Sequence, residues 1–307
     1  MKIYPGTSHV KLKKAVVTIG NFDGVHLGHQ KIFKRVIQRC KKIGGTSVVF
    51  TFYPHPLKVL DPKRVPPSLT TFEEKIKLIE SIGIEVLIYE RFTKRFANQS
   101  PLEFIENILH NRVHACEILV GQDYAFGKNR EGSVEILKEL SKQYNYRLWI
   151  IKNVVVDGIP VRSTSIRNLI QQGDVKTAGR LLGRPYTIEG KVIRGYKRQI
   201  GFPTANIKPP QKLIPKDGVY VGWVNTQKGK FPSVINIGLT PTFGNKQRSI
   251  EAHILNFEGN LYGKSIRIEF VERLRDEKKF RSVRSLVNQI EKDIKEATLI
   301  LGRKPEK

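Results

Sequence analysis

A change of rhythm near residue 184 constrains the fold more than any other feature of the sequence. Before it, short apolar runs typical of buried strands alternate with helical patterns, which indicates a parallel sheet covered on both faces. Two short helices, near residues 164–171 and 175–182, end this part. The expected strands lie at 15–19, 47–53, 85–89, 117–120 and 147–151, and longer helices are expected from His26, over 71–81, from Pro101 and over 133–143.

After Gly183-Arg184-Pro185, short strand candidates separated by Gly, Pro and Asn dominate. They lie at 186–193, 219–225, 233–237, 250–257 and 264–270, and the pattern indicates an antiparallel barrel or sandwich. An amphipathic helix over 282–301 ends the chain. We therefore predict two domains, residues 1–184 and 185–307, which agrees with a prior of about 150 residues per domain.

Net charge is the extreme feature of the composition, at +26 from 54 Lys+Arg against 28 Asp+Glu. Such a field attracts polyanions, so RNA and phosphorylated substrates are both candidate partners. The charges are spread along the whole chain, which favours a solvated surface over a nucleic-acid site. No apolar run approaches the ~18–20 residues of a membrane span, and no signal peptide is recognisable. With two cysteines and no disulfide framework, we predict a cytoplasmic protein without a membrane partner.

The first candidate site is His26-Leu27-Gly28-His29, which opens a helix directly after a strand. Backbone N–H groups and the positive dipole end make a helix start an anion site, suited to nucleotide phosphates. Gly28 lets a nucleotide approach the backbone, and the two imidazoles could stabilise charge on phosphorus. The pair could instead bind a metal, although no third ligand is evident, or serve only surface or packing roles.

The stretch from Thr18 to Gln30 resembles the first motif of nucleotidyltransferases with an HxGH signature, and above all that of bacterial bifunctional riboflavin kinase/FAD synthetases. Thr51–Pro56, Gly121–Gly127 and Val161–Arg167 resemble three further segments of that family. The resemblance implies that His26 and His29 are catalytic. It also implies ATP or phosphate contacts from Gly20, Asn21, Gly28, Ser163, Thr164 and Arg167, and flavin contacts from Phe52, Pro54, Pro56 and Asp123.

The last of these motifs departs from the usual family form. Arg162 stands where Ser is common, and Ser165 stands where Arg is common. We expect Arg167 to reach the anion, with Ser163 able to cap the helix. Whether Arg162 replaces the missing arginine is open. Asp23 could orient a metal-bound water or could cap its own loop.

The second half carries a different set of motifs. Residues 258–265 have three residues between their glycines where a P-loop needs four, so a P-loop is rejected. Gly201–Asn206 instead resembles the riboflavin kinase motif, which implies that Gly201, Thr204 and Asn206 bind the nucleotide and that Thr204 and Asn206 hold Mg²⁺. Within 250–255, the resemblance makes Glu251 the base for the riboflavin 5′-hydroxyl. Glu251 could instead form a surface ion pair with Arg248, and 201–206 could be a plain Pro-anchored turn. The loop 195–201 is shorter than is usual in the family.

Both motif sets together imply an α/β plus β fold. It would combine an N-terminal Rossmann-like nucleotidyltransferase parallel sheet with a C-terminal antiparallel β-barrel and a terminal helix. They also imply a transferase that makes FMN from riboflavin and FAD from FMN, with Mg²⁺, ATP as co-substrate, and FMN and FAD as products rather than prosthetic groups. We expect no nucleic-acid partner despite the charge, and an oligomer is left open. A single-activity HxGH enzyme would not explain 201–206 or Glu251. An RNA-binding protein with vestigial motifs is the non-enzyme alternative.

Overall fold

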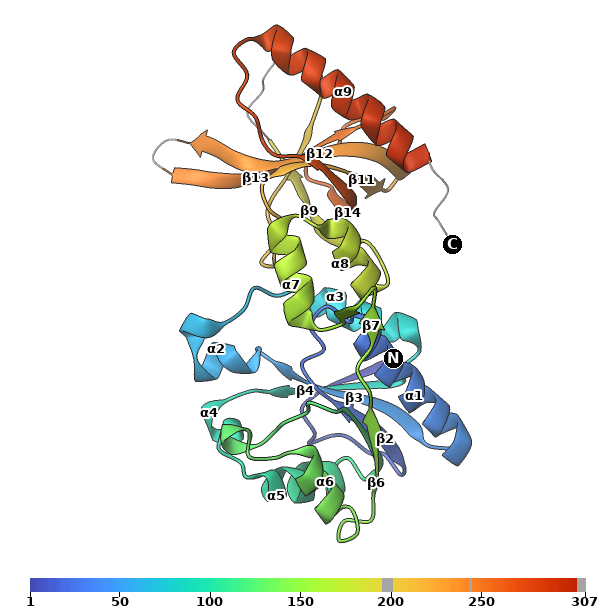
Figure 1. Cartoon of the computed structure of the whole chain (residues 1–307). Helices are drawn as coiled ribbons and strands as arrows, with labels where there is room; N and C mark the ends of the chain where they lie inside the picture. The colour runs from blue at the N-terminus through green and yellow to red at the C-terminus, as the bar shows by residue number, and fades with distance from the viewer. Residues whose placement is uncertain (195–200, 243–244, 303–307) are drawn as a thin grey trace. The chain divides into compact units, whose positions relative to one another are not determined.

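The computed structural model describes the backbone of residues 1–194, 201–242 and 245–302. It describes the side chains of the same residues except 240–242 and 245–247. The chain forms two compact units, residues 1–163 and 164–307 (Figure 1). The predicted functional boundary near residue 184 stays a prediction, because compactness alone does not say where each catalytic domain ends.

The first unit is built on a six-stranded sheet whose order is β1-β4-β3-β2-β5-β6. Every neighbouring pair is parallel, so the predicted parallel sheet is confirmed. In a parallel sheet the carboxyl ends of the strands share one edge, which gathers the loops that follow them. The strands are β1 (Lys2–Pro5), β2 (Ala15–Ile19), β3 (Thr46–Tyr53), β4 (Val86–Arg91), β5 (Ala115–Gly121) and β6 (Arg147–Ile151).

Helices cover both faces of this sheet. On one face α1 (Leu27–Ile43) and α3 (Phe72–Ile82) bury Phe33 and Ile79 against β-branched and leucine side chains of the central strands. On the other face the π-helix η2 (Phe104–His110) and α6 (Val134–Leu140) pack into a second apolar cluster. The shorter helical pieces are α2 (Pro56–Leu60), η1 (Pro62–Arg64), α4 (Lys94–Ala97), α5 (Pro101–Glu103) and η3 (Lys128–Arg130).

The second unit is a closed antiparallel barrel with strand order β10-β13-β12-β11-β14-β9, so the barrel is confirmed and the sandwich is not. Alternate residues fill its interior, among them Ile235, Ala252 and Ile268, all fully buried. The strands are β9 (Tyr186–Ile193), β10 (Ala205–Ile207), β11 (Gly218–Thr226), β12 (Gly229–Thr242), β13 (Asn245–Ile254) and β14 (Ser265–Arg275).

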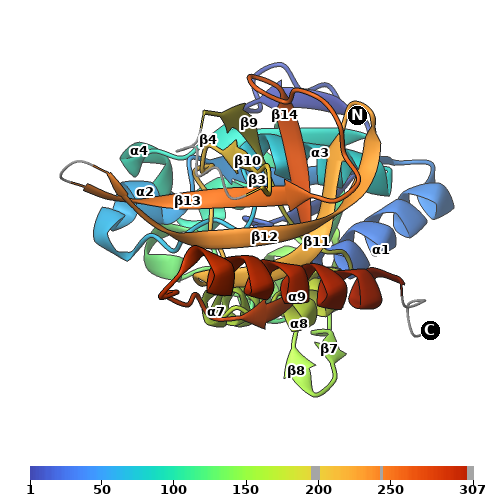
Figure 2. The ribbon, with the colours of Figure 1, turned by 90° about the horizontal axis from the view of Figure 1, so that it is seen from above.

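Three helices accompany the barrel. The terminal helix α9 (Val283–Gly302) lies beside β12 and β11, with Ala297 fully buried (Figure 2). Asp293 of α9 accepts bonds from Arg275 of β14, with Arg275 Nη2 at 2.7 Å from Oδ2. Helices α7 (Ser163–Gln172) and α8 (Val175–Leu182) match the two short helices expected there, and α8 packs on β14 and β9.

Several strands escaped prediction. β1 is only four residues long and mostly exposed, so it has no alternating pattern. The hairpin of β7 (Val155–Val156) and β8 (Ile159–Pro160) is too short for periodicity, but its turn, Asp157-Gly158 with φ of 51° and 76°, is a recognisable signal. β12 and β14 run beyond the expected 233–237 and 264–270, because neighbouring strands supply ladder bonds past the apolar stretch.

Candidate active sites

The two histidines of the first motif meet at the start of α1. His26 is the N-cap residue, and its Nδ1 accepts a bond from the His29 backbone N at 3.4 Å. The rings stack with centroids 3.6 Å apart, and His26 is almost fully buried. A residue three positions on lies on the same side of a helix, so this stacking follows from the spacing. The pair lies at the carboxyl edge of the sheet, where the strand-following loops gather.

Gly28 leaves room for this close packing. A Cβ built on Gly28 would stand 3.1 Å from the His26 ring and 3.4 Å from the Val161 carbonyl oxygen. In the structure, the groups that lie close to Gly28 are therefore the His26 imidazole and the Val161 backbone. Close approach of a nucleotide to Gly28 stays a prediction. Gly20, at the end of β2, is similarly crowded, since an added Cβ would lie 3.0 Å from the Phe22 ring.

The loop between β2 and α1 is strained and firmly anchored. Phe22 and Val25 have φ of 50° and 41°, a left-handed conformation that is rare for a β-branched side chain. The buried Asp23 carboxylate accepts bonds from the backbone N of Leu69 at 3.0 Å and of Thr70 at 3.1 Å. These contacts tie the β2–α1 loop to the segment before α3, which is a structural role of Asp23 but not the capping of its own loop.

Asn21 is held by Lys75, which lies outside the sequence motifs, and by His55, which lies within Thr51–Pro56 but had no predicted role. Lys75 of α3 donates to the Asn21 carbonyl oxygen at 2.7 Å, and His55 Nε2 lies 3.4 Å from the Asn21 Nδ2 position. Burial lowers the pKa of Lys75 to about 8, and the nearby Asp23 carboxylate opposes this shift. The sequence pattern places this lysine on the solvated face of an amphipathic helix. Its contact with Asn21 can therefore be seen only in the folded structure.

The predicted flavin segment follows β3. Phe52 is half-buried against Phe92 and Phe96, and the Tyr53–Pro54 peptide bond is cis. Pro56 opens α2 at a first-turn position, where its missing N–H costs nothing. These residues lie at the same edge of the sheet as His26 and His29.

Asp123 lies in the loop after β5, at this edge too, and forms an ion pair with Arg162. Arg162 Nη2 is 2.6 Å from Asp123 Oδ2, and both side chains are more than half exposed. Asn153 adds a weaker bond to the same oxygen at 3.3 Å. The arginine that stands in an unusual place in the motif thus contacts a predicted flavin residue.

The Ser/Thr-rich motif joins the loop after β2 through Ser163. The Ser163 hydroxyl donates to the Asp23 carbonyl oxygen at 3.0 Å, a contact with the β2 loop rather than with the first turn of its own helix. Thr164 is exposed and Arg167 is partly buried, both in the first turns of α7. They fall in the second unit, so their positions relative to His26 and His29 stay a prediction.

The second candidate site is a row across three barrel strands. Glu251 of β13 stands directly opposite Asn206 of β10 and opposite Asn236 of β12. Their strand neighbours Ala205 and Ile250 point into the buried interior, so the three polar side chains share the outer face. Directly opposed residues have Cβ atoms about 5 Å apart, which brings two amides and a carboxylate together.

The motif 201–206 is fixed against this row. His253, the next outward residue on β13, has its Nδ1 2.9 Å from the Pro203 carbonyl oxygen and its ring against Phe202. Thr204 is exposed and stands two positions before Asn206, and Gly201 has a φ of 84° that favours glycine. Most of the shortened loop, residues 195–200, lies outside the described part of the chain.

The charged neighbours of Glu251 differ from the ion pair that was considered. Arg248 Nη2 pairs with Asp217 at 2.7 Å instead. Within the described residues Glu251 forms no ion pair, which suits a group that must accept a proton. The Glu277 carboxylate covers Gly238 on the neighbouring strand, and burial together with the Asp217 carboxylate raises the pKa of Glu277.

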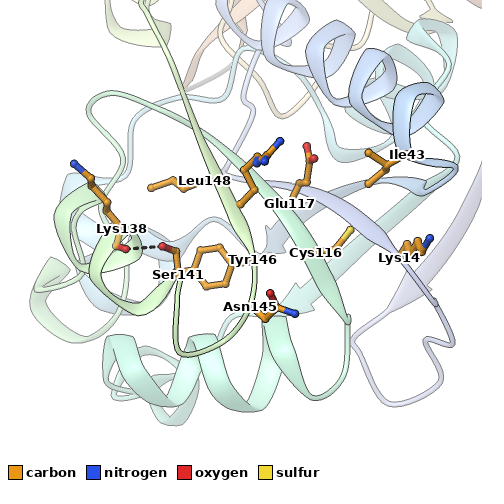
Figure 3. A pocket seen from close by; sticks show the side chains of 10 residues that line it. Lys14, Ile43, Cys116, Glu117, Lys138, Ser141, Asn145, Tyr146 and Leu148 are labelled. Carbon is orange, nitrogen blue, oxygen red and sulfur yellow. Dashed lines mark hydrogen bonds between the residues drawn. The ribbon is translucent and has the colours of Figure 1, made fainter.

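A cavity of about 640 Å³ lies in the first unit, away from the histidine pair (Figure 3). It opens at the amino ends of β2, β5 and β6, where Lys14, Glu117 and Arg147 line it. None of the predicted site residues lines it. Glu117 is already engaged by Arg39, whose Nε lies 2.7 Å from Oε2, and by Trp149. We therefore assign no chemistry of the motifs to this cavity.

Two family models match the chain in the order of the motifs. The model described as FAD synthetase matches residues 8–165, and the model described as riboflavin kinase matches residues 182–301. Described residues include no helix long and apolar enough to cross a membrane. A crystal structure named as a macrolide-efflux protein from Streptococcus pneumoniae is also similar. Its TM-score is 0.87 at 31% identity, and the match covers 95% of this chain and 97% of that one.

Curated relatives carry both names on one polypeptide. A bifunctional riboflavin kinase/FMN adenylyltransferase of Buchnera aphidicola is 37% identical, and the match covers 96% of each chain. The protein of the same name from Bacillus subtilis is 39% identical over 92% of each chain. Relatives of this identity and coverage share a fold and a domain order with the chain. The chain belongs to the family of bifunctional riboflavin kinases/FMN adenylyltransferases.

Proposed function

We propose that this chain phosphorylates riboflavin to FMN with its barrel and adenylylates FMN to FAD with its parallel-sheet unit. ATP serves as co-substrate in both reactions. The row Asn206–Glu251–Asn236 carries the proposal, because it places a carboxylate without an ion partner in the described residues beside two amides and the motif of residues 201–206. The stacked histidines at the start of α1 support the second activity.

In the kinase step, Glu251 takes the proton from the riboflavin 5′-hydroxyl. The hydroxyl oxygen attacks the γ-phosphorus of ATP, the bond to the β,γ-bridging oxygen breaks, and ADP leaves. Thr204 and Asn206 offer neutral oxygen donors, which suit Mg²⁺ when phosphate oxygens complete its shell. When bound there, Mg²⁺ would neutralise phosphate charge. Within the described residues no cluster of three His, Cys, Asp or Glu competes for that role.

In the adenylyl step, an FMN phosphate oxygen attacks the α-phosphorus of ATP in line, and pyrophosphate leaves. The chain contributes positioning and charge stabilisation rather than covalent chemistry. His26 and His29 stand at a helix start, where the dipole and N–H groups favour anions. We assign phosphate contacts also to Gly20, Asn21, Gly28, Ser163, Thr164 and Arg167, and flavin contacts to Phe52, Pro54, Pro56 and Asp123.

Surroundings and partners complete the proposal. Riboflavin, FMN and ATP are the partners, and FMN and FAD leave as products. We place the protein in the cytoplasm, where two free cysteines would stay reduced. The net charge of +26 is assigned to surface solvation, not to a nucleic acid, and the oligomeric state is left open.

The test is a time course with purified protein, riboflavin and Mg-ATP, in which the flavins are separated by chromatography. We expect FMN first and FAD later. FMN without FAD would disprove the adenylyl assignment. Absence of both, with FMN and ATP also supplied directly, would disprove the whole proposal, and RNA binding at physiological salt would then be measured.

A further inference from the structure

His55 uses both of its ring nitrogens. It is the N-cap residue of α2, and its Nδ1 accepts a bond from the Leu57 backbone N at 3.2 Å. A neutral imidazole carries one proton, so a ring whose Nδ1 accepts must carry that proton on Nε2. The helix cap therefore fixes the tautomer of His55, and its Nε2 is a donor.

That donor faces the side chain of Asn21. The Nδ2 position of Asn21 lies 3.4 Å from His55 Nε2, and two donors cannot bond each other. A half-turn of the amide exchanges its oxygen and nitrogen without moving other atoms. Oδ1 then accepts from Nε2–H, and the NH₂ group takes the opposite position. In the structure the atom at that position is buried and has no hydrogen-bond partner.

The backbone of Asn21 is fixed independently. Its carbonyl oxygen accepts from Lys75 Nζ at 2.7 Å and from the Thr51 hydroxyl at 3.4 Å. The side chain can therefore change its orientation only by rotation of its own torsions. A buried NH₂ without a partner costs about 1–3 kcal/mol, and an anionic ligand oxygen would relieve that cost.

We propose that His55 is a positioning residue for adenylyl transfer. Its Nε2–H holds Asn21 Oδ1, so that the Asn21 NH₂ is presented as a donor to the phosphates of ATP. The inference rests on the proposed adenylyl function of this unit. His55 then acts through Asn21 and need not touch ATP itself.

Two substitutions separate the functions of the two ring nitrogens. His55→Asn retains an acceptor that can cap α2, but its shorter side chain does not reach Asn21. His55→Gln reaches further and restores an amide N–H toward Asn21. We expect His55→Asn to raise KM for ATP about tenfold with kcat within about twofold, and His55→Gln to stay within about twofold of the parent. The assay is FAD formation from FMN and ATP. The midpoint of thermal unfolding of the first unit is the folding control, and riboflavin phosphorylation on the same samples shows that the second unit is unaffected.

A double-mutant cycle completes the test. In an Asn21→Ala background, His55→Asn should have no further effect on KM for ATP, because the group it positions is gone. Additive effects would overturn the inference, as would a larger loss in His55→Gln than in His55→Asn. A rise in KM for FMN with KM for ATP unchanged would also overturn it, since His55 would then serve the flavin segment. If the parent chain makes no FAD, the proposed function fails and the inference fails with it.

Discussion

In the first unit the site residues stand on loops that follow parallel strands, whereas in the barrel they stand on the strands themselves. Asn21 and His26 depend on a loop with two non-glycine residues in the left-handed region. A buried carboxylate and a partly buried lysine hold this loop. Glu251 and Asn206 depend only on strand register. A loop can bring N–H groups and a helix start toward phosphates, but it needs buried polar anchors. A row of residues on neighbouring strands is held by the backbone hydrogen bonds between the strands, so it needs no such anchors.

This contrast predicts how each site fails. The polar residues that hold the loop should couple catalysis to the stability of the first unit. Removing one of them leaves buried hydrogen-bond donors without an acceptor. Outward residues of the barrel row should be replaceable with little change in stability, because the interior layer holds the strands. Activity and stability should therefore change together in one unit and separately in the other.

The largest expected effect is at Glu251. Glu251→Gln keeps the side-chain shape but removes the base, and should slow riboflavin phosphorylation by about 10²–10⁴-fold. FAD formation from FMN and ATP, and the midpoint of thermal unfolding, should not change. Glu258→Gln, at an exposed turn, is the matched control. An equal loss of both activities in folded Glu251→Gln would refute separate sites.

His29→Ala should have the reverse effect. It removes the stacked partner of His26 and the charge stabilisation at the start of α1, so FAD formation should fall by about 10²–10³-fold. Riboflavin phosphorylation should remain. His9→Ala, at an exposed position, serves as control, and chromatography of both products from each variant gives the readout. Retention of FAD synthesis in His29→Ala would remove the histidine pair from the mechanism.

Sequence reasoning reached the fold class and both motif sets because these depend on local spacing. Strand–helix alternation predicts the parallel sheet, and the HxGH spacing by itself places His26 and His29 together at a helix start. It could not choose between barrel and sandwich without the family resemblance, since closure depends on the pairing of β9 with β10 and β14. Short elements such as β1 have no period to detect.

The supporting residues of the sites could not be predicted for a related reason. Lys75 lies more than fifty positions from Asn21, on a helix whose pattern suggests only a solvated face. An ion pair of Glu251 with Arg248 was the alternative for Glu251, but Arg248 bonds Asp217, next to the start of β11. Such partners depend on tertiary packing. His55 had a partial signal, because a His before Pro at a strand end is placed to cap a helix.

Asp23→Ala should destabilise the first unit by about 3–5 kcal/mol, since it leaves buried donors of Leu69 and Thr70 without an acceptor. FAD formation should be lost with it, whereas riboflavin phosphorylation at moderate temperature should remain. Asp293→Ala is the matching variant in the barrel unit, because it removes the carboxylate that Arg275 bonds. Thermal unfolding with both assays would test this, and a stable, inactive Asp23→Ala would show a direct chemical role.

Lys75 should make stability depend on pH in the alkaline range. Its folded pKa of about 8 lies below the unfolded value of about 10.4, so the unfolded chain holds more protons between these values. Stability should therefore rise from pH 8 to pH 10, by about 2 kcal/mol relative to Lys75→Met. Lys77→Met, exposed on the same helix, should show no such difference. If the unfolding free energies of the parent and of Lys75→Met change in parallel with pH, the lowered pKa of Lys75 is contradicted.

The smallest effect is expected at Arg162. Its exposed ion pair with Asp123 is the weakest of the contacts that hold the loops of the first unit. Arg162 and Asp123 pair at 2.6 Å with side chains 54% and 59% exposed, and exposed pairs contribute about 0–1 kcal/mol. Arg162→Ser should therefore leave stability almost unchanged and FAD formation within about threefold, far less than Arg167→Ala. A loss equal to that of Arg167→Ala, seen in KM for ATP, would mean that Arg162 leaves Asp123 to bind the nucleotide. A loss confined to KM for FMN would mean that it acts by holding Asp123 against the flavin. Exposed loop contacts would then matter through the ligand they orient, not through the fold they stabilise.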